Sequence, residues 1–151
     1  RRRPGLDAAV RAVTHLGDAV TTIVVAILLL LAPVPAWQPA ARAGAFALVF
    51  SHLLVQLLKR TVSRPRPQLP VGMASLVEAP DRFSFPSGHA AAALSIALAA
   101  SAIVPVLLAP WVLALGLLVG VSRCYLGVHY PGDVLAGWLL ALSAFAAAGA
   151  F

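Results

Sequence analysis

The chain has 151 residues, of which 61% are hydrophobic and 11% are charged. An ordinary soluble domain is about 45–50% apolar and about 25% charged, so this chain has too little polar surface to cover a water-soluble globule. The composition argues against a disordered chain, a nucleic-acid-binding module and, because Cys124 is the only cysteine, a disulfide scaffold. In a membrane protein, the net charge of +6 serves orientation, phospholipid contact or substrate binding.

The N-terminal segment predicts a short helix that lies on the membrane surface. Leu6, Val10, Val13 and Leu16 recur at helical spacing, which gives this segment one apolar face. Three arginines at positions 1–3 precede it, as in a signal peptide. The apolar run that follows is too long for a signal peptide, and no small-residue cleavage site comes soon after it, so we expect it to remain as a span.

Long stretches without charge predict five membrane-spanning helices. A transmembrane helix needs about 20 residues, and the stretch 90–121 is too long for one span, so Pro105 and Pro110 divide it. The predicted spans are about 19–36, 43–59, 88–104, 110–126 and 132–151. Small residues four apart, such as Gly116 and Gly120, favour close helix contact in lipid. We therefore expect one all-α domain over residues 1–151, an integral membrane helical bundle of five transmembrane helices preceded by the interfacial helix.

Residues 60–86 predict a long loop at the membrane surface. This segment contains five prolines and six charged residues, which prevent a regular apolar helix. Long loops without secondary structure are uncommon unless they serve a function. We therefore expect functional residues in this loop.

The parity of five spans places most polar residues on one side of the membrane. The N-terminus, the 60–86 loop and residues 122–133 share that side, and the turns at 37–42 and 105–110 lie on the other. Trp37 and Trp111 fall on the far side, where an aromatic belt is expected. Among the basic residues, only Arg42 falls there. Charged groups near a bilayer are functional candidates, so the chemistry is predicted to gather on the near side.

Three clusters on the near side together predict an anion site with two histidines. They are Lys59 followed after six residues by Arg66-Pro67, then Pro86-Ser87-Gly88-His89, and finally Ser122-Arg123 with His129 and Asp133. The basic side chains supply positive charge, and an arginine fork matches phosphate oxygens in pairs. Because Ser87 can cap the helix that follows it and Gly88 lets a ligand approach the backbone, this helix start also offers N–H groups to an anion.

The positions of the two histidines predict different roles. Asp133 follows His129 by four residues and could hold one ring nitrogen, which would leave the other nitrogen free to attack. His89 could then protonate a leaving oxygen. Because no Cys/His cluster or grouped carboxylate set occurs, we expect no metal site and no cofactor.

These three clusters resemble the three-part signature of the type 2 phosphatidic acid phosphatase (PAP2) superfamily. The five predicted spans of the chain make it similar to the membrane-embedded bacterial lipid phosphatases of that superfamily. The resemblance implies metal-independent hydrolysis of a phosphate monoester or pyrophosphate through a phosphohistidine. It implies His129 as nucleophile, Asp133 as its orienting partner and His89 as general acid. The implied phosphate-binding residues are Lys59, Arg66, Ser87, Gly88 and Arg123. The implied substrates are undecaprenyl pyrophosphate, phosphatidylglycerol phosphate, phosphatidic acid or a polyprenyl-phosphoryl pentose phosphate.

Several polar residues near these clusters have simpler interpretations. His52 and Gln56 share a helix face with Lys59, and we expect a structural hydrogen-bonding role for them. His15 and Asp18 could edge the site, but a position on the surface is the favoured interpretation. Arg64 could bind phosphate or lipid headgroups. Tyr125 and Tyr130 could anchor at the interface or line an entrance to the site. Glu78 and Asp81 could pair with Arg82 or have no role.

The excess of basic residues on the near side predicts a cytoplasmic active site in a multi-pass protein of the inner (plasma) membrane. Arginines kept for lipid phosphate would weaken this inference, and a further span upstream would reverse it. Two other classes of function stay open, namely a non-catalytic protein that binds or transports lipid phosphates on the same scaffold, and a vanadate-dependent peroxidase. An intact set of His89, His129 and Asp133 favours the phosphatase over the first, and the hydropathy disfavours the second.

Overall fold

The computed structural model describes residues 3–68, 75–78 and 81–149, and this part of the chain is helical without a β-strand. Its α-helices are α1 (Pro4–Thr14), α2 (Ala19–Leu31), α3 (Gln38–Val62), α4 (Gly88–Ser101), α5 (Ala109–Tyr125) and α6 (Pro131–Ala148). Two 3-10 turns, His15–Gly17 and Pro35–Trp37, join α1 to α2 and α2 to α3. The all-α prediction is confirmed. Arg1, Arg2 and the last two residues of the predicted fifth span lie outside the described residues.

Proline marks the first turn of four helices, α1, α3, α5 and α6. The missing N–H of proline costs nothing there, because the first N–H groups of a helix have no partner within the helix. Helix α4 begins differently, since the hydroxyl of Ser87 accepts a hydrogen bond from the backbone N–H of Ala90 at 3.4 Å. The predicted cap at Ser87 is therefore confirmed.

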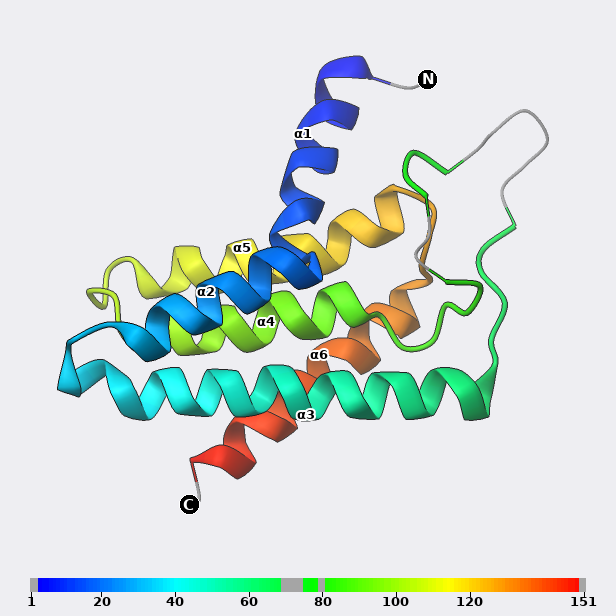
Figure 1. Ribbon diagram of the computed structural model, residues 1–151. Helices are drawn as coiled ribbons and strands as arrows, with labels where there is room; N and C mark the ends of the chain where they lie inside the picture. The colour runs from blue at the N-terminus through cyan, green and yellow to red at the C-terminus, as the bar shows by residue number, and fades with distance from the viewer. Residues whose placement is uncertain (1–2, 69–74, 79–80, 150–151) are drawn as a thin grey trace.

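Helix α4 is the centre of the bundle and packs against α2, α3, α5 and α6. Figure 1 shows α2 to α5 lying side by side, with α6 crossing them and α1 steeply inclined to them, and α1 packs against α5. The contacts of α4 are close because its buried side chains are mostly alanine and serine. A Cβ on Gly44 would lie 2.4 Å from that of Ala99, and one on Gly116 would lie 2.6 Å from that of Ala97. Small residues thus permit the close packing that we predicted.

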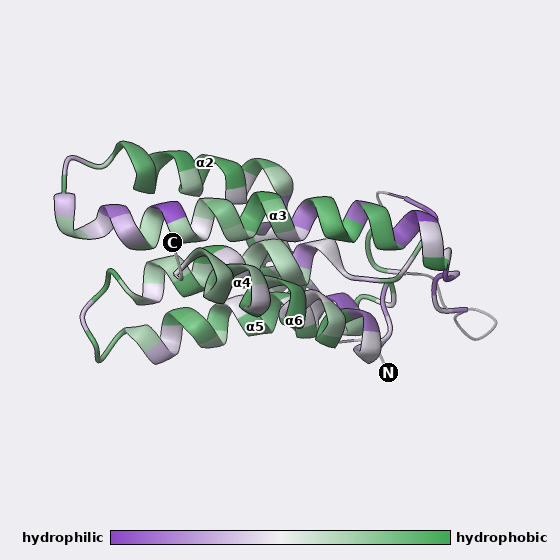
Figure 2. Cartoon of the chain, turned by 90° about the horizontal axis from the view of Figure 1, so that it is seen from below, coloured by the Kyte–Doolittle hydropathy of each residue, from purple (hydrophilic) through white to green (hydrophobic). Residues whose placement is uncertain are grey.

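The outer surfaces of the helices are apolar, as Figure 2 shows, and large side chains such as Val20 and Leu31 are each 75% exposed. Two helical segments, Pro35–Val62 and Pro131–Ala148, are long and apolar enough to cross a membrane, and the bent pair Pro4–Gly17 and Ala19–Leu31 could form a third span. Helices α4 and α5 are apolar but shorter. These features agree with a membrane protein, while the number of five spans stays a prediction.

The two ends of the bundle differ in polarity, as the parity of the helices predicts. The described parts of the 63–87 loop and the 126–130 link lie at one end, which is hydrophilic, and the turns at 32–37 and 102–108 lie at the other. Helix α3 begins at Gln38, earlier than expected, because the Gln38 amide donates to the carbonyls of Leu30 and Ala32 and closes the turn. Arg42 consequently lies within α3 and not in a connection.

Candidate active site

A cavity of about 390 Å³ opens at the hydrophilic end of the bundle. Its charged and imidazole side chains are Lys59 and His52 on α3, Asp81 in the loop, His89 on α4 and His129 in the link before α6, and Thr22 and Gln56 add uncharged polar groups. Its other walls are apolar side chains of α2 and α3, among them Ile23, Leu48, Val49, Leu53 and Val55. The cavity therefore joins a charged end to an apolar groove between two helices.

His129 lies at the buried edge of this cavity and is 4% exposed. Its Nε2 atom is 3.4 Å from a terminal nitrogen of Arg66, which also donates to the carbonyl of Val128 at 2.7 Å. Its Nδ1 atom is 3.6 Å from the Asp133 carboxylate, and this buried nitrogen makes no hydrogen bond within the described part of the chain. The structure thus brings Asp133 beside His129, as predicted, at a distance slightly longer than a hydrogen bond.

Burial and positive charge both act on His129. Burial lowers the pKa of His129, and the neighbouring charges of Arg66, Arg123 and Lys59 lower it further, to about 3. A histidine with this pKa is neutral at physiological pH, and its unprotonated nitrogen can act as a nucleophile.

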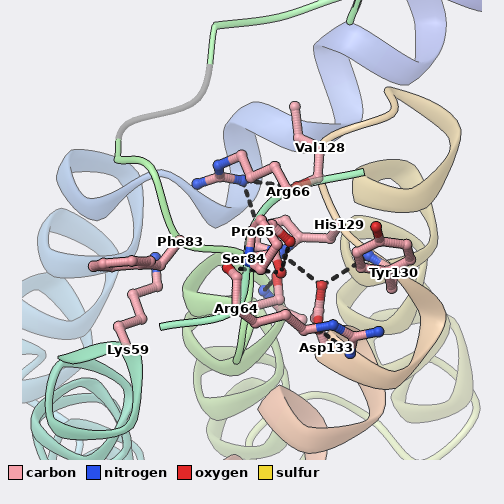
Figure 3. Close-up of polar contacts among 12 residues, drawn as sticks. Lys59, Arg64, Pro65, Arg66, Phe83, Ser84, Val128, His129, Tyr130 and Asp133 are labelled. Carbon is pink, nitrogen blue, oxygen red and sulfur yellow. Dashed lines mark hydrogen bonds and ion pairs between the residues drawn. The ribbon is translucent and has the colours of Figure 1, made fainter. Parts of the chain in front are cut away.

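Asp133 is fully buried and held by two donors (Figure 3). One oxygen accepts from the backbone N–H of Tyr130 at 2.8 Å, which closes a capping box at the start of α6. The other accepts from Arg64 at 3.0 Å, and the Arg64 guanidinium also lies 4.2 Å from the centre of the Tyr130 ring. Arg64 therefore contacts the carboxylate behind His129, which differs from the expected contact with phosphate or headgroups.

The predicted cations converge on the same end of the bundle. Lys59 is buried at 7% exposure and pairs with Asp81, whose other oxygen is 3.1 Å from Arg66. Arg123 is buried at 2% exposure and donates to the Thr14 hydroxyl at 2.8 Å, while its Nε is buried without a partner in the described residues. The pairing of Asp81 with Lys59 and Arg66 replaces the expected pairing with Arg82.

His89 makes a contact that sequence reasoning missed. Its Nε2 is 2.8 Å from one oxygen of Asp18, and the other oxygen of Asp18 is 2.7 Å from Nδ1 of His15. The favoured surface position holds for His15, whose side chain is 68% exposed, whereas Asp18, at 40% exposure, lies at the edge of the site, as the other interpretation allowed. A separation of 71 residues hides this contact from any local motif.

Backbone atoms of α6 hold the start of α4 in position. The N–H of Ser87 donates to the carbonyl of Asp133 at 2.9 Å, which ties α4 to α6. A Cβ on Gly137 would lie 2.5 Å from the Ser87 carbonyl, so only glycine permits this approach. Gly88 lines the cavity, but a Cβ there would meet Val55 at 3.6 Å, an ordinary contact.

The remaining candidates lie around the site. His52 and Gln56 are hydrogen-bonded to each other at 3.3 Å, as expected, and both also line the apolar groove. The Tyr125 hydroxyl donates to Asp7 at 2.7 Å and joins α5 to α1. His52 and Gln56 thus lie on the α3 wall of the cavity that His89 and His129 also line.

This helical bundle, with a cationic pocket and two histidines at one end, has the architecture of membrane phosphatases. The model of the PAP2 superfamily matches residues 40–150, and the chain belongs to this family. The predicted family is confirmed.

Sequence relatives agree with this assignment. Decaprenylphosphoryl-5-phosphoribose phosphatase of Mycobacterium tuberculosis is 38% identical over 140 residues, covering 89% of this chain and 74% of that protein. Phosphatidylglycerophosphatase B of Bacillus subtilis is 33% identical over 163 residues, covering 95% and 74%. Both names describe phosphatases that act on lipid phosphates, and they confirm the predicted enzyme class.

Solved structures show the same fold. The crystal structure of Aquifex aeolicus LpxE has a TM-score of 0.84 at 26% identity and covers 99% of this chain and 88% of that one. The PAP2-type phosphatidylglycerolphosphate phosphatase of Bacillus subtilis has a TM-score of 0.75 at 30% identity, covering 99% and 78%. The bundle is therefore the fold of membrane PAP2 phosphatases over its whole length.

Proposed function

We propose that this protein hydrolyses the phosphate ester or pyrophosphate of a membrane lipid through a phosphohistidine on His129. The observation that carries the proposal is the cavity, in which Lys59, His89 and His129 lie at one end and apolar side chains of α2 and α3 continue from them. A lipid phosphate has the same two parts, a charged headgroup and an apolar chain. Ile23, Val49 and Leu53 in the groove are each at least half exposed, so the groove opens toward the lipid.

The phosphoryl oxygens are bound by the cations and by the start of α4. Lys59, Arg66 and Arg123 supply charge, and Nε of Arg123 is a buried donor without a partner in the described residues. Ser87 and the N–H of Gly88 complete the set at the helix N-terminus. These groups stabilise the charge that spreads over the phosphoryl oxygens during transfer.

The first step transfers the phosphoryl group to the enzyme. Nε2 of His129 attacks phosphorus, so that a P–N bond forms as the bond to the leaving oxygen breaks. His89 donates a proton to that oxygen. Asp133 stabilises the positive charge that develops on the His129 ring.

The second step returns the enzyme to its starting state. His89, now neutral, takes a proton from water, whose oxygen attacks phosphorus as the P–N bond breaks. Inorganic phosphate leaves, and His89 is again protonated. Every group in this cycle belongs to the chain or to water, so the reaction proceeds without a metal ion.

The names of the relatives narrow the choice among the candidate lipid substrates. The mycobacterial relatives at 38% identity are named for decaprenylphosphoryl-5-phosphoribose, and a Sulfolobus acidocaldarius relative at 38% over 98 residues is named undecaprenyl-diphosphatase. Both names describe polyprenyl lipids, whose long, methyl-branched chains suit an open groove better than a closed pocket. Polyprenyl-phosphoryl pentose phosphate is therefore the first candidate, ahead of undecaprenyl pyrophosphate, phosphatidylglycerol phosphate and phosphatidic acid.

The proposed setting is the inner (plasma) membrane, which the single domain crosses five times. Helices α4 and α5 are shorter than a full span, and flanking turns at the far end add to their length. Apart from the residues assigned to phosphate, the parity of the spans assigns every basic residue of the sequence except Arg42 to the side of the site, which favours a cytoplasmic active site.

Phosphate release from a panel of lipid phosphates and pyrophosphates in detergent, with a chelator present, tests the proposal. We expect release from a polyprenyl-phosphoryl pentose phosphate and no release by His129→Ala. Thr61→Ala, which changes an exposed α3 side chain outside the cavity, is the folding control and should keep wild-type activity. Binding of lipid phosphate without any release would contradict the proposal and indicate a non-catalytic protein. Loss of all activity in chelator would contradict the metal-independent reaction.

A further inference from the structure

We propose that Asp18 is a positioning residue for His89, and that it holds the ring so that Nδ1 donates its proton to the leaving oxygen. This inference rests on the proposed function, because it assigns His89 to the leaving group. It adds a second pair of imidazole and carboxylate beside His129 and Asp133. Asp18 also lies before residues 40–150, the part of the chain that the family model matches.

The contact itself is short and joins segments far apart in sequence. Nε2 of His89 is 2.8 Å from Oδ1 of Asp18, and the two side chains are 20% and 40% exposed. In the described part of the chain, Nδ1 of His89 has no hydrogen-bond partner and is not sealed by burial. That nitrogen is therefore available to a ligand in the cavity that His89 lines.

The backbone shows that Asp18 is not simply a helix cap. Asp18 is the N-cap residue of α2, a position where an aspartate usually accepts from the N–H groups of its own helix. Its side chain makes no such hydrogen bond and bonds to His15 and His89 instead. Thr22 fixes the backbone, because its N–H and its hydroxyl both donate to the Asp18 carbonyl at 3.0 Å. The carboxylate is thus directed at the histidines although a capping role was open to it.

The segment before Asp18 packs directly on the start of α4. A Cβ on Gly17 would lie 3.0 Å from the backbone oxygen of His89 and 2.6 Å from a methyl group of Val119. Thr14, one turn earlier, accepts a hydrogen bond from Arg123. The segment from Thr14 to Asp18 therefore contacts both the proposed general acid and a cation of the phosphate site.

This contact has a defined chemical consequence. A carboxylate that accepts from Nε2–H stabilises the doubly protonated ring and fixes its orientation, so that Nδ1–H points away from Asp18. When the bond from phosphorus to the leaving oxygen breaks, the Nδ1 proton moves to that oxygen. His89 is then neutral and keeps its hydrogen bond to Asp18. Replacing Asp18 should therefore slow the first step, phosphoryl transfer to His129, only for substrates whose leaving oxygen needs this proton.

Two substrates that differ in their leaving groups provide the test. The alkoxide of a lipid phosphate monoester is a poor leaving group and needs the proton, whereas the phenolate of p-nitrophenyl phosphate needs it little. For Asp18→Asn we expect the first-step rate on the lipid phosphate, measured in a single turnover as release of the leaving alcohol, to fall about 10- to 100-fold, a part of the roughly 10²–10⁴-fold that a general acid contributes. With p-nitrophenyl phosphate, the same single-turnover rate, measured as release of p-nitrophenol, should fall by less than about threefold, since binding and attack are retained.

The controls separate positioning from folding. Asp7→Asn is the matched control, because the Asp7 carboxylate also joins the N-terminal segment to the bundle by accepting a hydrogen bond from Tyr125. This variant should change the rates on both substrates by the same factor. In the His89→Asn background, Asp18→Asn should add no further loss, because coupled residues are not additive. If Asp18→Asn does not yield folded protein, Asp18→Glu tests the same geometry, because it keeps the charge and moves the carboxylate.

The outcomes are distinct. An equal loss of the first-step rate on both substrates, or an additive loss in the His89→Asn background, would show a structural role and overturn the inference. Unchanged activity of Asp18→Asn on lipid phosphate, with His129→Ala inactive, would overturn it while leaving the proposed function intact. Activity that survives in His129→Ala would instead contradict the proposed function itself.

Discussion

Asp81 places a carboxylate between Lys59 and Arg66, the two cations that we assign to the phosphate. Burial alone would raise the pKa of Asp81, but the hydrogen bond and charge of Lys59, with a smaller contribution from Arg66, hold it below its usual value. Asp81 is thus ionised at neutral pH and neutralises the cations when no substrate is bound. A phosphate group must displace this carboxylate before it can bind both cations.

Replacing Asp81 with asparagine should therefore strengthen phosphate binding. Because the competing negative charge is gone, we expect inorganic phosphate to inhibit Asp81→Asn at a concentration several-fold lower than it inhibits the wild type. Glu78→Gln, which changes another acidic residue of the loop, is the matched control and should leave inhibition unchanged. Inhibition constants measured at one pH check this, and weaker inhibition of Asp81→Asn would show that Asp81 instead supports the cations.

His129 provides a prediction on pH. Its pKa of about 3 means that the ring stays neutral as the pH falls from 7 to 4 and becomes protonated only below that range. NMR titration of a variant in which His129 is the sole histidine should show this low midpoint. In Arg66→Gln the midpoint should rise, because a positive charge that opposes protonation is removed. A midpoint near 6.5 in the presence of Arg66 would contradict the electrostatic account.

The local motifs made His89, His129 and Asp133 predictable as site residues. They did not indicate the further partners of His89 and Asp133. Asp133 follows His129 by four residues across a helix start, and that spacing alone indicates contact. Asp18 and Arg64 lie 71 and 69 residues from their partners, His89 and Asp133. Only the packing of the helices brings such residues together, so no spacing rule could have found them.

At the scale of elements, the contact between α4 and α6 positions the site. Gly137 of α6 lies against the carbonyl of Ser87, and the Ser87 N–H bonds to the Asp133 carbonyl. The start of α4, which we propose to bind phosphate through its N–H groups, is therefore positioned by α6, the helix that carries Asp133. A displacement of α6 would move the proposed nucleophile and the proposed phosphate site relative to each other.

The variant Gly137→Ala tests this dependence. A methyl group 2.5 Å from the Ser87 oxygen must push the two helices apart, and overpacking of this kind costs about 1–3 kcal/mol. We expect a lower thermal midpoint and a loss of turnover. Gly149→Ala, at the other end of α6, meets only atoms at 3.6 Å or more and should change neither property. Normal turnover in stable Gly137→Ala protein would show that the site tolerates movement of α6.

The starts of the elements were easier to predict than their ends. Ala19, Gly88 and Pro131 begin helices within one residue of the predicted starts, because polar residues, a cap and a proline mark them. Helix α3 instead runs from Gln38 to Val62, beyond both predicted boundaries. The predicted span was bounded by the charged residues Arg42 and Arg60. The helix continues past both of them, because a charged side chain does not interrupt the backbone hydrogen bonds of a helix that leaves the apolar region.

At the scale of the whole molecule, the helical arrangement puts every cluster of the signature at one end. The described loop residues and the link before α6 lie opposite the turns at 32–37 and 102–108 (Figure 1). The number of connections between spans made this separation predictable. Which of the two ends faces the cytoplasm is inferred from the count of basic residues, and a labelling experiment measures it directly.

Cysteine labelling in intact cells measures this direction. With Cys124 replaced by alanine, we expect Glu78→Cys and Leu107→Cys to react with a membrane-impermeant reagent from opposite sides. Leu107 should be labelled from outside and residue 78 only after the membrane is opened, because we propose that the basic end faces the cytoplasm. Labelling of both positions from the same side would contradict the five-span arrangement.

The central claim, that His129 carries the phosphoryl group, is tested most directly by trapping the intermediate. Wild-type protein mixed with lipid phosphate labelled with ³²P and quenched rapidly in base should carry the label on the peptide that contains His129, and acid should release it. His129→Ala should carry no label and release no phosphate. Turnover by His129→Ala at the wild-type rate, or a label found on another residue, would contradict the account.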